Sequence, residues 1–224
     1  MWYKVKRILV GTQQVRPSWW TPWPNTLFYA PLNWNYNSEW TLSPSYNTSS
    51  WVTYPSLWDI QYAYVNNGQM VWNIWTPPTN NITFQARVNW ISEWVVAVWA
   101  TTWAVWAGST WIEIYFSWTQ RAVYTQNSNT WYGTASNSNT NTWYLVTWVK
   151  SWTTLSLYKN RALIWSVTCA SSFYPKTNII IANNGDKPVS NTSMRVSNII
   201  FENKAWTATE ITNYYNQTKW NYLL

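Results

Sequence analysis

Residues 141–167, NTWYLVTWVKSWTTLSLYKNRALIWSV, break into short runs of β-branched and aromatic residues separated by polar, turn-like pairs. Residues 143–149, 153–158 and 161–167 are each long enough for one strand, and their residue types favour extended backbone. The intervals between them are too short for anything but tight turns. This segment therefore predicts three consecutive strands, and it indicates an all-β fold.

The same alternation of short apolar runs and polar clusters extends along most of the chain. The longest separator is TQNSNTWYGTASNSNTNT at 125–142. Many short strands with turn signals between them are typical of a sandwich or barrel, so we expect an antiparallel β-sandwich. Beyond the three strands above, we predict strands at 4–9, 27–30, 59–65, 70–75, 82–90, 94–100, 111–117, 121–125, 177–182 and 193–202.

The C-terminus has a different pattern, WTATEITNYYNQTKW at 206–220. Thr207 followed three residues later by Glu210 is a capping box, which marks a helix start. Ile211 and Tyr215, four residues apart, give this helix one packing face. We expect a short structural helix.

The charge distribution argues against a nucleic-acid surface. The 224-residue chain has 14 basic and 7 acidic residues, a formal charge of +7, yet only 9% of residues are charged. Lys4, Lys6, Arg7 and Arg16 lie near the start, and the other basic residues are scattered and form no stripe. Residues 1–15 have a short apolar run and predict no secretory signal.

The nineteen uncharged residues from Trp94 to Ile112 approach the length of a membrane span. Four Ser and Thr residues interrupt them, and tryptophan prefers the membrane interface to its centre. The segment also ends in a period-two run, with Ile112 and Ile114 on one face and Glu113 on the other. It predicts two strands and no membrane span.

Cysteine and histidine usage limits the chemistry. Cys169 is alone and the chain has no histidine. An intrachain disulfide, the usual zinc sites and a histidine-based triad are therefore excluded. Cys169 lies in an apolar context that indicates a small, buried strand residue.

Tryptophan is abundant where glycine is expected. The chain has 24 Trp and 5 Gly, whereas average usage predicts about 16 Gly, and turns need residues with positive φ. We hypothesise that the gene comes from an organism or phage that reads UGA as glycine. The candidate positions, to which Trp111 can be added, are Trp2, Trp19, Trp34, Trp51, Trp94, Trp103, Trp106, Trp118, Trp131, Trp148, Trp152, Trp165 and Trp220.

With these positions read as glycine, residues 141–167 resemble the central motif of LamG-like jelly rolls in the concanavalin A-like lectin/glucanase superfamily. Trp143 begins the strand of that motif, and Tyr158 and Asn160 match its "L-Y-x-N-G" hairpin. Arg161 replaces the usual glycine. Residues 193–217 resemble the closing strand and helix of the family.

Two further segments fit the same resemblance. Residues 25–37 resemble the opening strand, and residues 81–92 resemble a strand in which Arg87 stands where an aromatic is usual. The resemblance implies a jelly roll over residues 25–224, preceded by a basic arm or hairpin with a linker at 1–24. That arm is similar to segments near the start of some phage structural proteins.

The carboxylates give little support for catalysis. Glucanase members of the superfamily carry two catalytic carboxylates in an "E-x-D-x-x-E"-type strand. No two of the seven acidic residues here lie within five positions of each other. We expect a chain that is not an enzyme, with a glucanase-type glycoside hydrolase as an alternative.

The preferred interpretation is a recognition or adhesion domain that binds glycans or a cell-surface polymer, outside the cell or on a virion. Aromatic faces would contact sugar rings, and Asn, Ser and Thr side chains from loops 126–142 and 183–188 would bind hydroxyls. Other virion proteins are possible partners, and a purely structural building block is the other alternative.

The candidate ligand-binding residues are Tyr132, Asn183, Asn184 and Asp186. Asp186 and Asn184 also offer oxygen ligands for Ca²⁺, as in some LamG-like domains. The alternatives stay open: residues 183–188 can be a simple Asn-Gly hairpin turn, and Tyr132 can pack on its own strand.

Overall fold

The computed structural model describes residues 26–30, 46–49, 52–53, 56–57, 60–66, 69–73, 81–90, 95–99, 111–116, 120–126, 129–135, 141–168, 178–181, 183–184, 187–188 and 193–219. Side-chain environments are described for residues 62, 64, 81–89, 141–168 and 193–219. The N-terminal arm predicted at 1–24, its strand at 4–9 and Cys169 lie outside the described residues.

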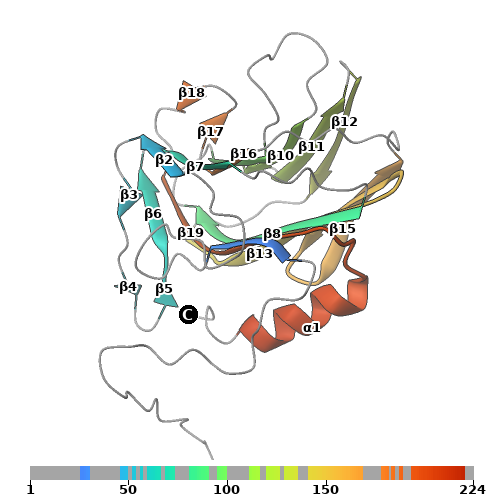
Figure 1. Cartoon of the computed structure of the whole chain (residues 1–224). Coiled ribbons are helices and arrows are strands. Elements are labelled where there is room, and N and C mark those ends of the chain that lie inside the picture. The colour runs from blue at the N-terminus through green and yellow to red at the C-terminus, as the bar shows by residue number, and fades with distance from the viewer. Residues whose placement is uncertain are drawn as a thin grey trace, which may run out of the picture.

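Two antiparallel sheets face each other and form a sandwich (Figure 1). The larger sheet has eight strands in the order β15-β14-β13-β8-β19-β6-β3, with β1 also paired to β19. Its strands are β1 (Thr26–Ala30), β3 (Val52–Thr53), β6 (Ala63–Asn66), β8 (Asn81–Trp90), β13 (Tyr144–Ser151), β14 (Thr154–Lys159), β15 (Ala162–Thr168) and β19 (Ser193–Glu202).

The smaller sheet has seven strands in the order β12-β11-β10-β9-β16-β7-β2. Its strands are β2 (Tyr46–Ser49), β7 (Gln69–Asn73), β9 (Val95–Trp99), β10 (Trp111–Phe116), β11 (Gln120–Gln126), β12 (Asn129–Ala135) and β16 (Asn178–Ile181). Two separate hairpins pair β4 (Ser56–Leu57) with β5 (Ile60–Gln61) and β17 (Asn183–Asn184) with β18 (Lys187–Pro188).

The predicted sandwich with a C-terminal helix is confirmed, and each strand predicted from 27–30 onward has a counterpart. Trp94–Ile112 holds β9 and the start of β10, two strands as predicted, and within the described residues no helix is long and apolar enough to cross a membrane. No strand was predicted at β2, β3 or β4, and the polar segment 125–142 is no continuous loop, because β12 lies inside it and pairs with β11. Its Asn, Ser and Thr residues concealed a strand, since pairing to β11 overrides their weak strand preference.

Helix α1 (Ala208–Thr218) lies against the outer face of the eight-stranded sheet, opposite the seven-stranded sheet (Figure 1). Its Ile211 and Tyr214 pack with Leu145, Val149 and Ile200 of the sheet. The predicted capping box is present, with reciprocal bonds between Thr207 and Glu210. The eight-stranded sheet is therefore covered on both faces along part of its length.

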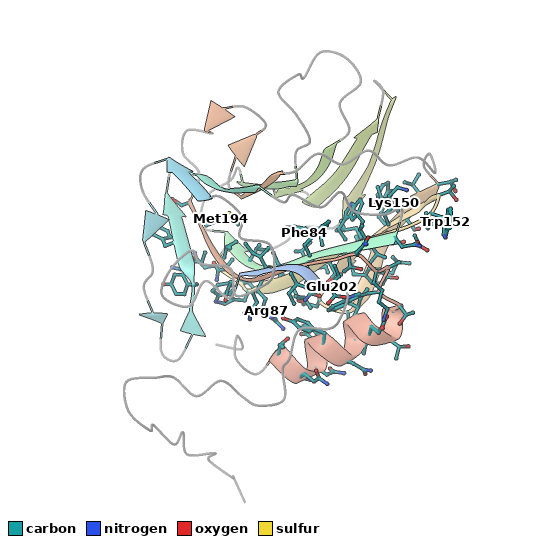
Figure 2. The ribbon with its side chains drawn as sticks, viewed as in Figure 1. Phe84, Arg87, Lys150, Trp152, Met194 and Glu202 are labelled. Carbon is teal, nitrogen blue, oxygen red and sulfur yellow. The ribbon has the colours of Figure 1, made fainter. Side chains whose placement is uncertain are left out.

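Strand β8 shows the consequence of this double cover. Its inner-face residues are apolar (Ile82, Phe84, Ala86, Val88) and its outer-face residues polar (Thr83, Gln85, Arg87, Asn89), yet all eight are buried. Figure 2 shows Phe84 and Arg87 on opposite sides of the ribbon. The polar residues of the outer face lie on the side of the sheet that helix α1 covers. Buried polar groups are usually hydrogen-bonded within the protein, and Thr147 Oγ1 accordingly donates to Gln85 Oε1 at 3.0 Å.

The two turns of the 141–167 segment have distinct backbone reasons. Asn160 has φ 59°, donates its N–H to the Leu145 carbonyl at 2.6 Å, and accepts the Leu145 N–H through Oδ1 at 3.0 Å. Asparagine tolerates this left-handed conformation. Arg161 has no positive φ, so the glycine usual in the resembled motif is not required there.

The other turn, between β13 and β14, begins at Trp152. This tryptophan has φ 50°, and 61% of its surface is exposed. Lys150, fully buried, donates from Nζ to the Trp152 carbonyl. Figure 2 shows this turn at the opposite end of the sheet from Met194.

Candidate functional site

A group of aromatic, amide and guanidinium side chains lies on the outer face of the eight-stranded sheet. We call it the arginine–aromatic cluster, and it consists of Tyr62, Tyr64, Asn89, Asn141, Trp143 and Arg195. Tyr64 pairs with Arg195 across β6 and β19, and Arg195 pairs with Asn89 across β19 and β8. Directly paired residues of neighbouring strands share a face, so this register builds a polar and aromatic row.

The row lies just beyond the end of the helix. Leu145, which packs against the helix, pairs with Arg87, and Asn89 follows Arg87 by two residues on the same face. Thr218, the last residue of α1, contacts Arg87. The cluster therefore lies on the same outer face as the helix, two residues further along β8 than Arg87 and just past the last residue of α1.

Arg195 is at the centre of the cluster. Its Cζ lies 5.8 Å from the centre of the Tyr62 ring, within the range of a cation–π interaction. Its Nη1 donates to Asn89 Oδ1 at 3.3 Å and to Asn141 Oδ1 at 3.5 Å. Both acceptors are neutral amides. Two amides and a ring thus fix one edge of the guanidinium.

The aromatic side chains support one another. Tyr62 and Trp143 pack edge to face, with ring centres 5.9 Å apart and planes at 67°. Tyr62 is buried at 6% exposure, whereas Tyr64, Trp143 and Arg195 are half-buried and Asn141 is exposed. A rigid buried ring therefore supports side chains that reach the surface.

Arg87 lies on the same face of the sheet as Arg195 but is buried. It is 2% exposed, its Nη2 donates to the Thr218 hydroxyl, and its Cζ lies 5.7 Å from the centre of the Tyr215 ring. The resemblance placed an aromatic at this position. The helix above β8 explains the arginine, because Thr218 and Tyr215 supply an acceptor and a ring.

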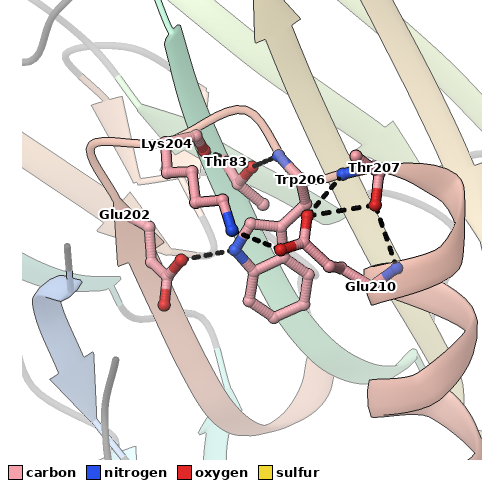
Figure 3. A network of polar contacts seen from close by, with 6 residues as sticks. All are labelled: Thr83, Glu202, Lys204, Trp206, Thr207 and Glu210. Atoms are coloured by element: carbon pink, nitrogen blue, oxygen red, sulfur yellow. Dashed lines mark hydrogen bonds and ion pairs between the residues drawn. The ribbon is translucent and has the colours of Figure 1, made fainter. Parts of the chain in front are cut away.

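The other end of the helix has a polar network that joins it to the sheet (Figure 3). Thr83 Oγ1 donates to the Lys204 carbonyl at 2.7 Å and accepts the Trp206 N–H at 2.9 Å. Trp206 Nε1 donates to the buried Glu202 carboxylate. Lys204 forms an ion pair with Glu210.

Glu210 has a shifted pKa. Partial burial raises it, but hydrogen bonds from Lys204 and Thr207, with the charge of Lys204, outweigh burial and lower the pKa below its ordinary value. The ionised Glu210 carboxylate therefore stabilises the start of helix α1 through its bonds to Thr207 and Lys204.

Glu202 and Glu210 are both bonded within the helix-end network, Glu202 to Trp206 Nε1 and Glu210 to Lys204. In the part of the chain with described side chains, no three His, Cys, Asp or Glu residues gather as a metal site would require. Glu113 lies in β10, paired with Val98 and Val123.

The residues predicted to bind ligand occupy other places. Tyr132 lies in β12 and pairs with Val123 of β11. Asn183 and Asn184 form β17 and pair with Pro188 and Lys187 of β18, the hairpin that was the alternative for this segment. Asp186 lies between these strands, outside the described residues. Ligand and Ca²⁺ binding at these positions stay predictions.

The cluster itself was not predicted, although the strands that carry several of its residues were. Tyr62 and Tyr64 fall in the strand predicted at 59–65, and Arg195 falls in that predicted at 193–202. Period-two alternation puts Tyr62 and Tyr64 on one face. What was missing is the register that joins β6, β19 and β8, strands about 130 positions apart in the chain at their extremes.

No protein-family model and no curated protein matches the sequence. Solved structures do share the fold. The binding domain of Paraclostridial Mosquitocidal Protein 1 aligns with a TM-score of 0.69 at 12% identity, over 86% of this chain and 52% of its own. The botulinum neurotoxin DC binding domain in complex with SialylT aligns with 0.69 at 12%, over 87% and 52%.

A third structure, from work on cell entry of botulinum neurotoxin type C through two ganglioside molecules, aligns with a TM-score of 0.66 at 13% identity, over 86% of this chain and 51% of its own. This chain thus spans about half the length of the structures that it resembles. The first two of these structures are named as binding domains. At such low identity the likeness shows the fold alone.

Proposed function

We propose that this chain is a non-catalytic binding domain that recognises glycans or another polymer of a cell surface. The arginine–aromatic cluster carries the proposal. It combines surface-reaching aromatic rings with amide groups and a cation, the groups that contact sugar faces, hydroxyls and anionic substituents.

The known structures support this proposal in a general way. One is described as a complex with SialylT. Another comes with the description that cell entry of botulinum neurotoxin type C depends on interaction with two ganglioside molecules. These descriptions belong to chains about twice as long. A location outside the cell would suit such a role, and it is part of the proposal.

A glycan array tests the proposal most directly. We expect the intact protein to bind a subset of glycans, and Tyr64→Ala or Trp143→Ala to weaken that binding at least tenfold because each removes a half-buried ring of the cluster. Leu163→Ala is the matched control, since Leu163 is a 54%-exposed apolar residue on β15. Glycan binding unaffected by both cluster variants would move the site elsewhere.

The loop site proposed from the sequence is a second location for the same function. Tyr132, Asn183, Asn184 and Asp186 would then contact ligand, with Asp186 and Asn184 binding Ca²⁺. Calcium titration of the protein, followed by Asp186→Asn, tests this site. If glycan binding is unchanged both by Ca²⁺ and by Asp186→Asn, the proposal of a ligand site in these loops is wrong.

A structural role in a virion or surface layer, without a glycan ligand, is the alternative that the sequence left open. Sedimentation of the protein across a concentration series separates the two functions. Self-assembly with an empty glycan array would favour the building block, and a monomer that binds glycans would favour recognition.

We also propose that Trp152 is encoded as glycine in the source organism, in line with the UGA hypothesis. Its φ of 50° and its 61% exposure support glycine there, since the left-handed region costs other residues free energy. Trp148 has no such backbone reason, because it is fully buried in the middle of β13 without a positive φ. Reading the codons decides each position.

A further inference from the structure

We propose that the arginine–aromatic cluster binds the carboxylate of an acidic sugar, such as a sialic or uronic acid, through Arg195. The inference rests on the proposed glycan-binding function and names the ligand class at the same site. It comes from the surroundings of Arg195, compared with those of Arg87 and of the two described carboxylates.

Arg195 has no carboxylate partner among the described residues. Its recorded contacts are Asn89, Asn141 and the Tyr62 ring. Glu202 and Glu210 are bonded in the helix-end network, and Glu202 pairs with Thr83, six residues along β8 from Asn89. At about 3.3 Å per residue, the backbone of Thr83, beside Glu202, lies roughly 20 Å from that of Asn89, beside Arg195.

The two arginines of the outer face have different roles. Arg87 is 2% exposed, and the helix covers it with Thr218 and Tyr215. Arg195 is half-buried, and the two recorded hydrogen bonds both use Nη1. A guanidinium has five N–H donors in a planar fork. The donors of Nη2 and Nε therefore have no recorded acceptor among the described residues.

A carboxylate matches that fork. Two parallel N–H···O bonds to the two carboxylate oxygens are the preferred geometry of arginine. The amides of Asn89 and Asn141 restrain the guanidinium, so that less conformational entropy is lost when a ligand binds. The net charge of +7 attracts anions to the protein in general.

The neighbouring groups favour a sugar as the carrier of that carboxylate. Tyr64 pairs directly with Arg195, and Trp143 packs on Tyr62. Half-buried rings beside the cation offer apolar faces for the C–H groups of a pyranose, and the exposed Asn141 amide offers hydrogen bonds to hydroxyls. The cluster thus combines the contacts required by an acidic monosaccharide at a chain end.

Calorimetric titration with matched saccharides tests the inference. The probes are sialyllactose, a glucuronate-containing disaccharide, and the methyl ester of each. We expect the free acids to bind on the order of tenfold more tightly than the esters, because a charge-assisted bond is lost in the ester. Raising the salt concentration should reduce this preference.

Variants place the preference at Arg195. Arg195→Gln should remove the difference between acid and ester, Arg195→Lys should keep part of it, and Arg161→Gln, at an exposed turn, should leave it intact. Thermal unfolding checks that each variant is folded. A preference that persists in folded Arg195→Gln overturns the inference.

The remaining outcomes separate the inference from the proposed function. Equal binding of acid and ester, lost in Tyr64→Ala, overturns the acidic ligand but keeps a neutral-glycan site. No binding of any of these saccharides, together with an empty glycan array, overturns both.

Discussion

The Arg87 guanidinium donates to the hydroxyl of Thr218, 131 positions along the chain, and this bond joins the middle of β8 to the last turn of helix α1. The same hydroxyl donates to the Tyr214 carbonyl at 2.7 Å. Thr218 therefore accepts from the sheet and donates to its own helix. Both residues are buried, so the bond is shielded from water.

Thr218→Val tests the contribution of this hydroxyl. The substitution keeps the shape of the side chain but removes the acceptor beside a buried charge, which should lower the free energy of unfolding by about 1–3 kcal/mol. Thr218→Ser keeps the hydroxyl and should cost less, about 0.8 kcal/mol for one methyl group. Equal losses in urea unfolding of the two variants would show that the bond contributes nothing.

The capping box gives a second prediction. Thr207→Ala removes the oxygen that accepts the Glu210 N–H at 3.2 Å, which should lower the free energy of unfolding by about 1 kcal/mol. Thr207→Ser should retain most of it. Circular dichroism during urea unfolding measures both variants, and an unchanged midpoint in Thr207→Ala would contradict the predicted role.

The lowered pKa of Glu210 predicts a pH dependence. A carboxyl group with a lower pKa in the folded state stabilises the fold fully above its unfolded pKa, and that contribution is lost as the pH falls through the folded pKa. The wild type should therefore be more stable than Glu210→Gln at pH 7, and the difference should shrink as the pH falls below the ordinary pKa of a carboxyl group. A difference that stays constant across this range would contradict the prediction.

The magnitude of this effect is small. The Lys204 and Glu210 side chains are 40% and 27% exposed, so water screens their ion pair, and such pairs contribute little. Comparing the two proteins at each pH removes the titration of the other acidic residues, since both contain them.

Local patterns in the sequence predicted the fold well, because strands and caps depend on neighbouring residues. Alternation located β8, β13 and β19, and Thr207 with Glu210 located the helix start. β12 was missed because its polar composition is that of a loop until pairing with β11 stabilises it.

The candidate site was less predictable, since it depends on distant pairings. Tyr64, Arg195 and Asn89 become neighbours through two strand registers, and no local pattern sets which residue of β6 faces Arg195. The burial of Arg87 needs a helix that begins 121 positions later to cover it, so alternation alone predicts an exposed side chain there. Loops with polar residues were the natural sites to choose from sequence, because binding residues concentrate there.

Trp152 gives the last prediction, which also tests the glycine hypothesis at the level of folding. Its left-handed backbone costs a residue with a Cβ about 1–2 kcal/mol, while glycine loses about 0.5–1 kcal/mol more chain entropy on folding. Trp152→Gly should therefore raise the free energy of unfolding by up to about 1.5 kcal/mol. Trp152→Ala removes the exposed ring but keeps the Cβ, so it should give no such gain.

Trp148→Gly is the contrasting variant on the same strand. Trp148 is fully buried opposite Phe84 and Leu157, and removing its side chain leaves a cavity that should cost about 3–5 kcal/mol. Urea unfolding of the three variants measures both effects. If Trp152→Gly and Trp152→Ala change stability equally, positive φ is not the reason for glycine at this turn, and the codon hypothesis loses its structural support there.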